Sequence, residues 1–230
     1  MKILIVSATE KEIIPLINSL AANSPTNEAN RYVYKSLIID ILITGIGSVF
    51  TTFNLIQKIS KNNYDLVINA GIAGSFSSFL KIGDVVYVHS DQFADLGIED
   101  ENSLYTIFDK GFISANAFPF QNGLLINPIK LNNSLIAGLK QVDAITVNTT
   151  HGRKESIEFF KHKYDPDIET MEGAAVFYVC LQQHVRFLQI RAISNYVRLR
   201  KKAEWDIPLA IENLNKKLFE LLVVLEIDSH

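Results

Sequence analysis

The chain is poor in the residues that mark several common classes of protein. It contains one cysteine, Cys180, and five histidines among 230 residues. These counts exclude an internal disulfide framework, and we expect no metal site and no metal cofactor. Basic residues do not outnumber acidic ones, because 22 Lys and Arg stand against 25 Asp and Glu, for a net charge of −3. A nucleic-acid-binding domain normally has a basic surplus, so we expect no nucleic-acid partner.

No stretch of the sequence is apolar for long enough to cross a membrane. The apolar run at residues 3–6 is short, and three charged residues at 10–12 argue against a secretory signal. Near the other end, two glutamates interrupt residues 218–227. We therefore expect a cytoplasmic protein with no membrane partner, and the single cysteine fits a reducing compartment.

Hydrophobic residues make up 48% of the chain and charged residues 20%, a composition typical of a globular protein. Short apolar runs alternate with amphipathic stretches, which predicts an α/β fold around a largely buried sheet. No repeat or linker divides the sequence, so we expect a single domain over residues 1–230. The expected strands are residues 2–7, 31–35, 37–43, 65–69, 84–88, 142–148 and 186–194. The expected helices are residues 10–20, a helix ending near 60, residues 171–183, and a last helix capped by Asp206.

The remaining segments are expected to lack regular structure. Residues 70–75 are interpreted as a loop after a strand, and residues 90–130 as irregular. In open α/β sheets, ligands bind beyond the carboxyl ends of the strands. The loops that follow residues 6, 43, 69, 148 and 193 are therefore where we expect the functional site.

Two glycine-containing turns follow expected strands, but neither matches a nucleotide-binding fingerprint. The turn at residues 45–47 lacks the third glycine of a dinucleotide motif, because position 50 is Phe50. The turn at residues 69–74 lacks the Gly-Lys-Ser/Thr end of a triphosphate loop. Its small residues, Ala73 and Gly74 among them, allow a ligand to approach the backbone closely, although a plain turn explains them equally well.

Three acidic residues are candidates for catalysis or binding. Glu10 and Glu12 follow the first expected strand, and either is a candidate general base, although acidic residues also favour exposed helix starts. Glu172 lies in the segment TMEGAA, where a strand passes into a helix. A buried carboxylate needs partners, and two sugar hydroxyls would satisfy it. The alternative for Glu172 is a surface glutamate in a first helical turn.

Polar residues also end the expected strand at 186–194. Asn195 presents a hydrogen-bond donor and an acceptor, although an asparagine in a turn is common. A basic stretch follows, and it is either a solvated loop or a clamp for a substrate carboxylate. Its members are Arg198, Arg200, Lys201 and Lys202.

Taken together, these segments resemble the nucleoside phosphorylase and nucleosidase superfamily. The matching segments occur in a consistent order at residues 3–12, 44–47, 69–74, 82–85, 171–175 and 191–194. The resemblance implies a three-layer α/β/α sandwich with a mixed central sheet, no metal or organic cofactor, and a homo-oligomer. It also implies a small-molecule nucleoside as substrate.

Within that superfamily, further segments are similar to the futalosine hydrolases. They are residues 93–100, 146–152, 189–197 and 205–213. This likeness implies an N-glycosidase of menaquinone biosynthesis that hydrolyses futalosine to hypoxanthine and dehypoxanthinylfutalosine.

The resemblance also implies roles for particular residues. Glu12 would activate the attacking water, Met171 would pack against the ribose, and Glu172 would bind the ribose hydroxyls. Arg191 and Ser194 would support the substrate, beside the small residues Ala73 and Gly74. The resemblance does not place the aromatic partner of the base, for which His151 and the phenylalanines between positions 108 and 120 are candidates.

Asn195 departs from the adenine-specific nucleosidases, which have an aspartate there, and this departure favours a 6-oxopurine. Rival interpretations remain: a methylthioadenosine/S-adenosylhomocysteine nucleosidase, a purine nucleoside phosphorylase, or a non-catalytic nucleoside-binding protein. A phosphorylase needs cations around its phosphate, whereas residues 7–12 offer one lysine and residues 69–74 offer none.

Overall fold

The computed structural model describes residues 1–23, 29–100, 103–129, 138–198 and 205–227. Its strands are β1 (Lys2–Ser7), β2 (Arg31–Tyr34), β3 (Leu37–Ile43), β4 (Leu66–Ser75), β5 (Val85–Asp91), β6 (Gly97–Asp100), β7 (Ser103–Thr106), β8 (Leu125–Ile126), β9 (Lys140–Thr146), β10 (Ile168–Thr170) and β11 (Phe187–Tyr196). Its helices are α1 (Glu10–Asn23), α2 (Ser48–Ile59), α4 (Lys154–Tyr164), α5 (Gly173–Gln182) and α6 (Ile207–Ile227).

The central sheet is mixed and partly closed on itself. Its strand order is β10-β9-β5-β11-β4-β1-β3-β2, and β8 pairs with β5. Strand β10 pairs in parallel with β9 and antiparallel with β4, so β4, β11, β5, β9 and β10 form a ring. Because of this closure, β10 and β11 lie on either side of the carboxyl end of β4.

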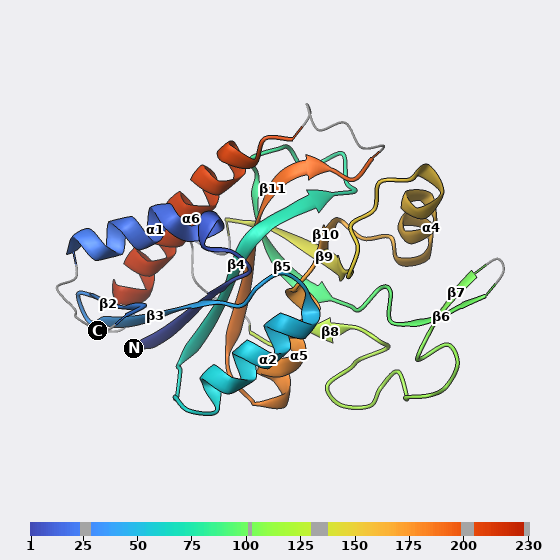
Figure 1. The fold of residues 1–230 in the computed structure, drawn as a ribbon, viewed down its shortest axis with the longest axis horizontal. Helices are drawn as coiled ribbons and strands as arrows, with labels where there is room; N and C mark the ends of the chain where they lie inside the picture. Colours follow the sequence, from blue (N-terminus) through green and yellow to red (C-terminus); the bar gives the residue numbers. More distant parts are fainter. Residues whose placement is uncertain (24–28, 101–102, 130–137, 199–204, 228–230) are drawn as a thin grey trace.

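Helices cover both faces of the sheet, with α1 and α6 on one face and α2 and α5 on the other (Figure 1). In β1, Ile3 and Ile5 belong to the core beneath α1 and α6, whereas Leu4 and Val6 belong to the core beneath α2 and α5. A strand buried on both faces is expected to be apolar without alternation. The prediction of a three-layer α/β/α sandwich with a mixed sheet is confirmed.

The structure corrects several local predictions. Strand β4 continues through Ser75, so the predicted loop at 70–75 is wrong. Small residues have low strand propensity, and here they are strand residues because two neighbouring strands pair with them closely. The irregular stretch at 90–130 contains the short strands β6, β7 and β8, and helix α4 was not predicted. Within the described ranges, no helix is long and apolar enough to cross a membrane.

Candidate active site

A cavity of about 430 Å³ opens where the ends of β1, β4, β10 and β11 converge. Eight residues are given a catalytic or substrate-binding role in the sequence analysis, and the structure places seven of them in the lining of this cavity. Those that line it are Glu12, Ala73, Gly74, Met171, Glu172, Ser194 and Asn195. The remaining one, Arg191, lies behind Glu172. Other lining residues that the sequence did not suggest for the site include Ile72, Glu169 and Trp205.

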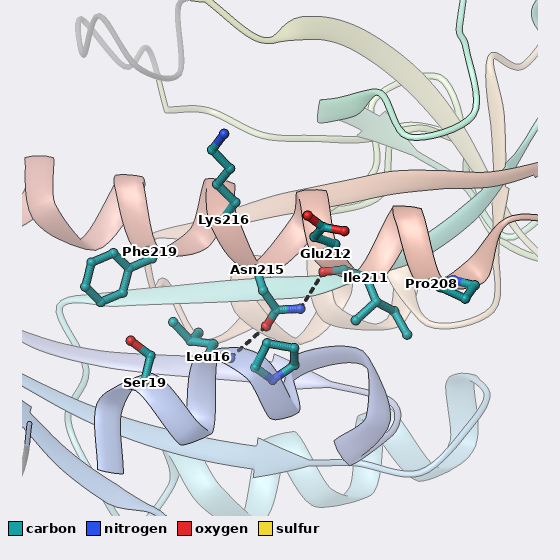
Figure 2. Close-up of a pocket in the computed structure, with 9 residues that line it drawn as sticks. Leu16, Ser19, Pro208, Ile211, Glu212, Asn215, Lys216 and Phe219 are labelled. Carbon is teal, nitrogen blue, oxygen red and sulfur yellow. Dashed lines mark hydrogen bonds between the residues drawn. The ribbon is translucent and has the colours of Figure 1, made fainter. Parts of the chain in front are cut away.

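Two further cavities lie elsewhere, and neither is lined by any of these eight residues. One of about 500 Å³ lies against Phe118 and His184, whose rings stack at 5.8 Å. The other, of about 350 Å³, lies between α1 and α6 (Figure 2). There the buried Asn215 amide accepts from the Leu16 amide and donates to the Ile211 carbonyl. We therefore take the cavity at the strand ends as the candidate active site.

Glu12 is held in one orientation in the first turn of α1. Its Oε2 accepts from the Thr9 amide at 2.9 Å and from the Thr9 hydroxyl at 2.9 Å, with the Ser7 hydroxyl at 3.3 Å. Its Oε1 accepts from the Ile72 amide at 3.2 Å. The spacing of Thr9 and Glu12 is that of a capping box, a local signal that the sequence carries. Glu10 is exposed, so only Glu12 of the two faces the cavity.

Glu172 lies at the start of α5 and is buried, so the alternative of a surface glutamate is wrong. Its Oε1 accepts from the Gly47 amide at 3.0 Å, in the turn after β3. Its Oε2 lies 4.0 Å from Nη2 of Arg191. Burial raises the pKa of the Glu172 carboxyl; Arg191 and the Gly47 amide oppose this shift, and the charge of Glu12 adds to it. Further hydrogen-bond donors would stabilise the charged form of this buried carboxylate.

Arg191 is a buried cation between two carboxylates. It pairs with Gly71 across β11 and β4, and it is 1% exposed. A β-carbon on Gly71 would lie 2.0 Å from Nη1 of Arg191 and 3.0 Å from Oε1 of Glu12. Glycine is thus required for the guanidinium to reach this place. Among the residues that the structure describes, none hydrogen-bonds to Nε or Nη2 of Arg191, so these nitrogens act on Glu172 through their charge.

Asn195 lies opposite Gly74, after a bulge at Ser194 in β11. The Ser194 hydroxyl lies 2.8 Å from Oδ1 of Asn195 and 3.2 Å from the Ala73 carbonyl. Asn195 Nδ2 donates to the Tyr196 carbonyl at 3.2 Å. An amide nitrogen carries two hydrogens, so the second remains for a ligand in the cavity.

A histidine and a glutamate line the cavity on the other side of Gly74. Glu169 of β10 pairs with Gly74, and its Oε2 hydrogen-bonds to Nδ1 of His151. Its Oε1 accepts from the His151 amide at 3.3 Å. The ring of Phe160 packs on His151 at a centroid distance of 4.0 Å. The sequence suggests His151 only as a contact of the base, and it does not indicate Glu169, because the pairing of β10 with β4 decides their proximity.

Behind the cavity, a closed polar cluster holds the start of α5. Asp91 is fully buried and accepts from Gln189 Nε2 at 3.0 Å and from the Thr146 hydroxyl at 2.9 Å. That hydroxyl accepts from the Ala174 amide at 2.7 Å. Burial raises the pKa of Asp91 to about 6, against the effect of these hydrogen bonds. Sequence reasoning missed this cluster; the available signal was a polar residue, Gln189, inside an apolar strand.

Other residues suggested by the sequence do not join the cavity. None of the phenylalanines between 108 and 120 lines it, and Phe108 and Phe120 pack on each other at 5.0 Å instead. Arg198 lies over the ring of Tyr196 at 5.2 Å. The other basic residues of that stretch lie outside the described residues: Arg200, Lys201 and Lys202. In the part of the chain that the structure describes, no group of three or more Asp, Glu, His or Cys is placed to hold a metal ion.

Comparison with known proteins finds the same family over nearly the whole chain. Residues 2–225 match the model of the phosphorylase superfamily. A futalosine hydrolase of Acidothermus cellulolyticus is 30% identical over 219 residues, which cover 93% of this chain and 87% of that protein. An aminodeoxyfutalosine nucleosidase of Campylobacter jejuni is 28% identical over 218 residues and 90% of each chain. The crystal structure of a 5′-methylthioadenosine/S-adenosylhomocysteine nucleosidase of Campylobacter jejuni has a TM-score of 0.78 at 26% identity, covering 98% of this chain and 99% of that one.

Proposed function

The chain belongs to the phosphorylase superfamily, and on that premise we propose that it hydrolyses futalosine to hypoxanthine and dehypoxanthinylfutalosine, a step of menaquinone biosynthesis. It is an N-glycosidase, as are its relatives that are named hydrolases and nucleosidases. The observation that carries the choice of futalosine is the orientation of the Asn195 amide at the end of β11. A cytoplasmic location is part of the proposal, because the single cysteine, Cys180, is buried and unpaired.

Two carboxylates suit the sugar side of this reaction. Cleavage of an N-glycosidic bond places positive charge on the ribose and negative charge on the departing purine. In the proposal, Glu12 takes a proton from the attacking water, because its carboxylate is oriented by Thr9 and Ile72. Glu172 accepts from the ribose hydroxyls, and Arg191 limits the repulsion between the two carboxylates. Met171 packs against the sugar from the same segment.

The Asn195 amide suits a 6-oxopurine. Its Oδ1 faces the Ser194 hydroxyl, so Nδ2 is left to point its second hydrogen at a ligand. Hypoxanthine presents acceptors at O6 and N7, and an amide N–H matches them at any working pH. An aspartate would instead place a negative charge against O6. Glycine at position 74 lets the Asn195 and Val197 side chains take their places in the lining, because a β-carbon there would lie 2.8 Å from Cγ2 of Val197 and 3.2 Å from Nδ2 of Asn195.

Hydrolysis is proposed in preference to phosphorolysis. Within the described lining of the cavity, Lys11 is the only lysine or arginine, and it is exposed. A bound phosphate ordinarily needs several cationic or amide donors, best supplied as bidentate arginine contacts. Arg191 is not available for that purpose, because it is buried behind Glu172.

Product analysis tests this function and separates it from its rivals. Purified protein is incubated with futalosine and with methylthioadenosine, each with and without phosphate. We expect hypoxanthine from futalosine at a rate that phosphate does not change. Adenine as the main product would identify a methylthioadenosine/S-adenosylhomocysteine nucleosidase. A sugar phosphate would identify a phosphorylase, and binding without turnover would identify a non-catalytic nucleoside-binding protein.

The role of Asn195 has its own test. Asn195→Asp should lower the ratio of kcat/KM for futalosine to that for its 6-amino analogue by about 10- to 100-fold. The matched control is Asn213→Asp, because Asn213 donates its amide to the Gly83 carbonyl and does not line the cavity. An unchanged ratio in Asn195→Asp would remove the main support for futalosine as substrate.

The proposal includes a homo-oligomer formed through the outer face of α2. Val49, Phe50 and Phe53 are 74%, 61% and 59% exposed. Ile46, which is 55% exposed, continues this apolar face to the rim of the cavity. Such a contiguous apolar face marks an interaction site, and a second copy of the chain is the proposed occupant. Phe53→Glu should shift the sedimentation of the protein to that of a monomer, whereas a wild-type monomer would contradict the proposal.

A further inference from the structure

One side of the cavity is formed by a glycine that is flanked by two polar residues. Glu169 of β10 and Asn195 of β11 both pair with Gly74 of β4. Residues that pair directly across strands point to the same face of a sheet, and all three line the cavity. Two strand spacings separate the flanking backbones, roughly 9–10 Å. A base bound in this cavity, beside Val197, would therefore meet Asn195 at one edge and the Glu169 side at another.

Glu169 fixes the imidazole of His151 in one tautomer. Oε1 of Glu169 accepts a hydrogen bond from the His151 amide, and Oε2 of Glu169 hydrogen-bonds to Nδ1 of the ring. An ionised carboxylate accepts only, so the ring hydrogen of the neutral imidazole lies on Nδ1. Nε2 is then an acceptor. In the described part of the chain, no residue hydrogen-bonds to Nε2, and Phe160 holds the ring in place.

We propose, resting on the proposed function, that His151 reads the N1 position of the purine through Nε2 and that Glu169 is its positioning residue. Hypoxanthine carries a hydrogen on N1, which Nε2 accepts. Adenine has a lone pair on N1, which Nε2 repels. His151 and Asn195 thus both select a 6-oxopurine. His151 accepts from the N1 hydrogen, and Asn195 donates to the neighbouring O6 and N7 edge.

The tautomer can be reversed by one conservative change. In Glu169→Gln, the side-chain oxygen stays on the His151 amide, because that amide needs an acceptor. The NH2 group of the glutamine then faces Nδ1 and donates to it. The ring hydrogen moves to Nε2, which now donates to N1 of a 6-aminopurine and opposes the N1–H of a 6-oxopurine.

The test compares kcat/KM for futalosine with kcat/KM for its 6-amino analogue. Glu169→Gln should lower this ratio by about 10- to 100-fold, with part of the change a gain on the 6-amino substrate. His151→Phe keeps a ring against Phe160 and should lower futalosine turnover without that gain. Glu158→Gln, on the exposed side of α4, is the matched control and should leave the ratio unchanged. Thermal melting checks that each variant folds.

Calorimetry of free bases separates this inference from the proposed function. Wild-type protein should bind hypoxanthine about 10- to 100-fold more tightly than 1-methylhypoxanthine, and His151→Phe should bind both alike. This result can hold even if futalosine is not the substrate, in which case only the proposed function fails. The inference is overturned if folded Glu169→Gln and His151→Phe both keep the wild-type ratio, or if wild-type protein binds the two bases equally.

Discussion

The cavity at the strand ends and the pocket between α1 and α6 have similar volumes and different chemistry. In the first, hydrogen-bonding capacity is left over at Nδ2 of Asn195 and Nε2 of His151. In the second, the Asn215 amide accepts from the Leu16 amide and donates to the Ile211 carbonyl (Figure 2). It also donates to the Glu12 carbonyl, so both of its hydrogens are used. Unused hydrogen-bonding capacity, more than volume, therefore distinguishes a functional cavity from a packing gap.

The pocket between α1 and α6 nevertheless contains a contact to the helix segment that carries Glu12. Asn215 bridges the peptide groups of Glu12 and Leu16, one helical turn apart in α1. Pro15 lies between them, and a proline inside a helix pushes the backbone ladder apart. The amide from α6 therefore joins two peptide groups of α1 on either side of Pro15, in the helix that presents Glu12 to the active site.

The largest effect on turnover is expected at Glu12, in the cavity at the strand ends. Glu12→Gln should reduce kcat by roughly 100- to 10,000-fold, the usual size of a lost general base, without a large change in melting temperature. Glu10→Gln is the matched control, because Glu10 is exposed two positions away, and it should change kcat little. Steady-state kinetics of both variants decide the point, and a larger loss in Glu10→Gln would contradict the role given to Glu12.

Asp91 tests how the buried polar cluster behind the cavity contributes to the stability of the fold. Its pKa of about 6 lies above the unfolded value, so its contribution to stability is fully present below about pH 4 and is lost as the pH rises through about 6. The difference in free energy of unfolding between wild type and Asp91→Asn should fall by about 2–3 kcal/mol from pH 4 to pH 8. Denaturant titrations measure it, with the exposed Asp165→Asn as control; a difference independent of pH would contradict the expectation.

Glu172 should make kcat/KM depend on the hydroxyls of the sugar. If its carboxylate accepts from both ribose hydroxyls, a 2′-deoxy substrate leaves it underpaired, at about 1–3 kcal/mol in kcat/KM. Glu172→Gln should reduce this preference for the ribose form, which a comparison of the two substrates in both proteins measures. Equal turnover of ribose and deoxyribose substrates by the wild type would contradict the assignment.

The smallest expected effect lies in the α1–α6 pocket. Asn215→Leu should lower the free energy of unfolding by roughly 1–2 kcal/mol, because an apolar group of similar size replaces a bridging amide. Lys216→Ala, at the rim of the same pocket, should change stability by less than about 0.5 kcal/mol. Denaturant unfolding distinguishes the two, and equal effects would show that the amide bridge does not stabilise the fold.

Local patterns predicted most of the fold, because the relevant interactions are close in sequence. The strand at residues 2–7 and the helix cap at Asp206, whose Oδ1 accepts from the Leu209 amide at 3.0 Å, needed no tertiary information. The prediction of a loop at residues 70–75 was wrong because the structure of this segment depends on contacts that are distant in sequence. Its small residues are strand residues only because β10 and β11 pair on either side of them, and Gly71 leaves room for Arg191.

The fold class follows from the sequence because it rests on apolar periodicity, and the family and several of the residues that line the cavity follow from motifs in a fixed order. Only the tertiary structure showed that Arg191 is buried behind Glu172 and that Glu169 orients His151. These relations depend on which strands become neighbours when the sheet closes. A closed ring of strands brings together side chains that are far apart along the chain, and no local sequence pattern specifies which strands become neighbours.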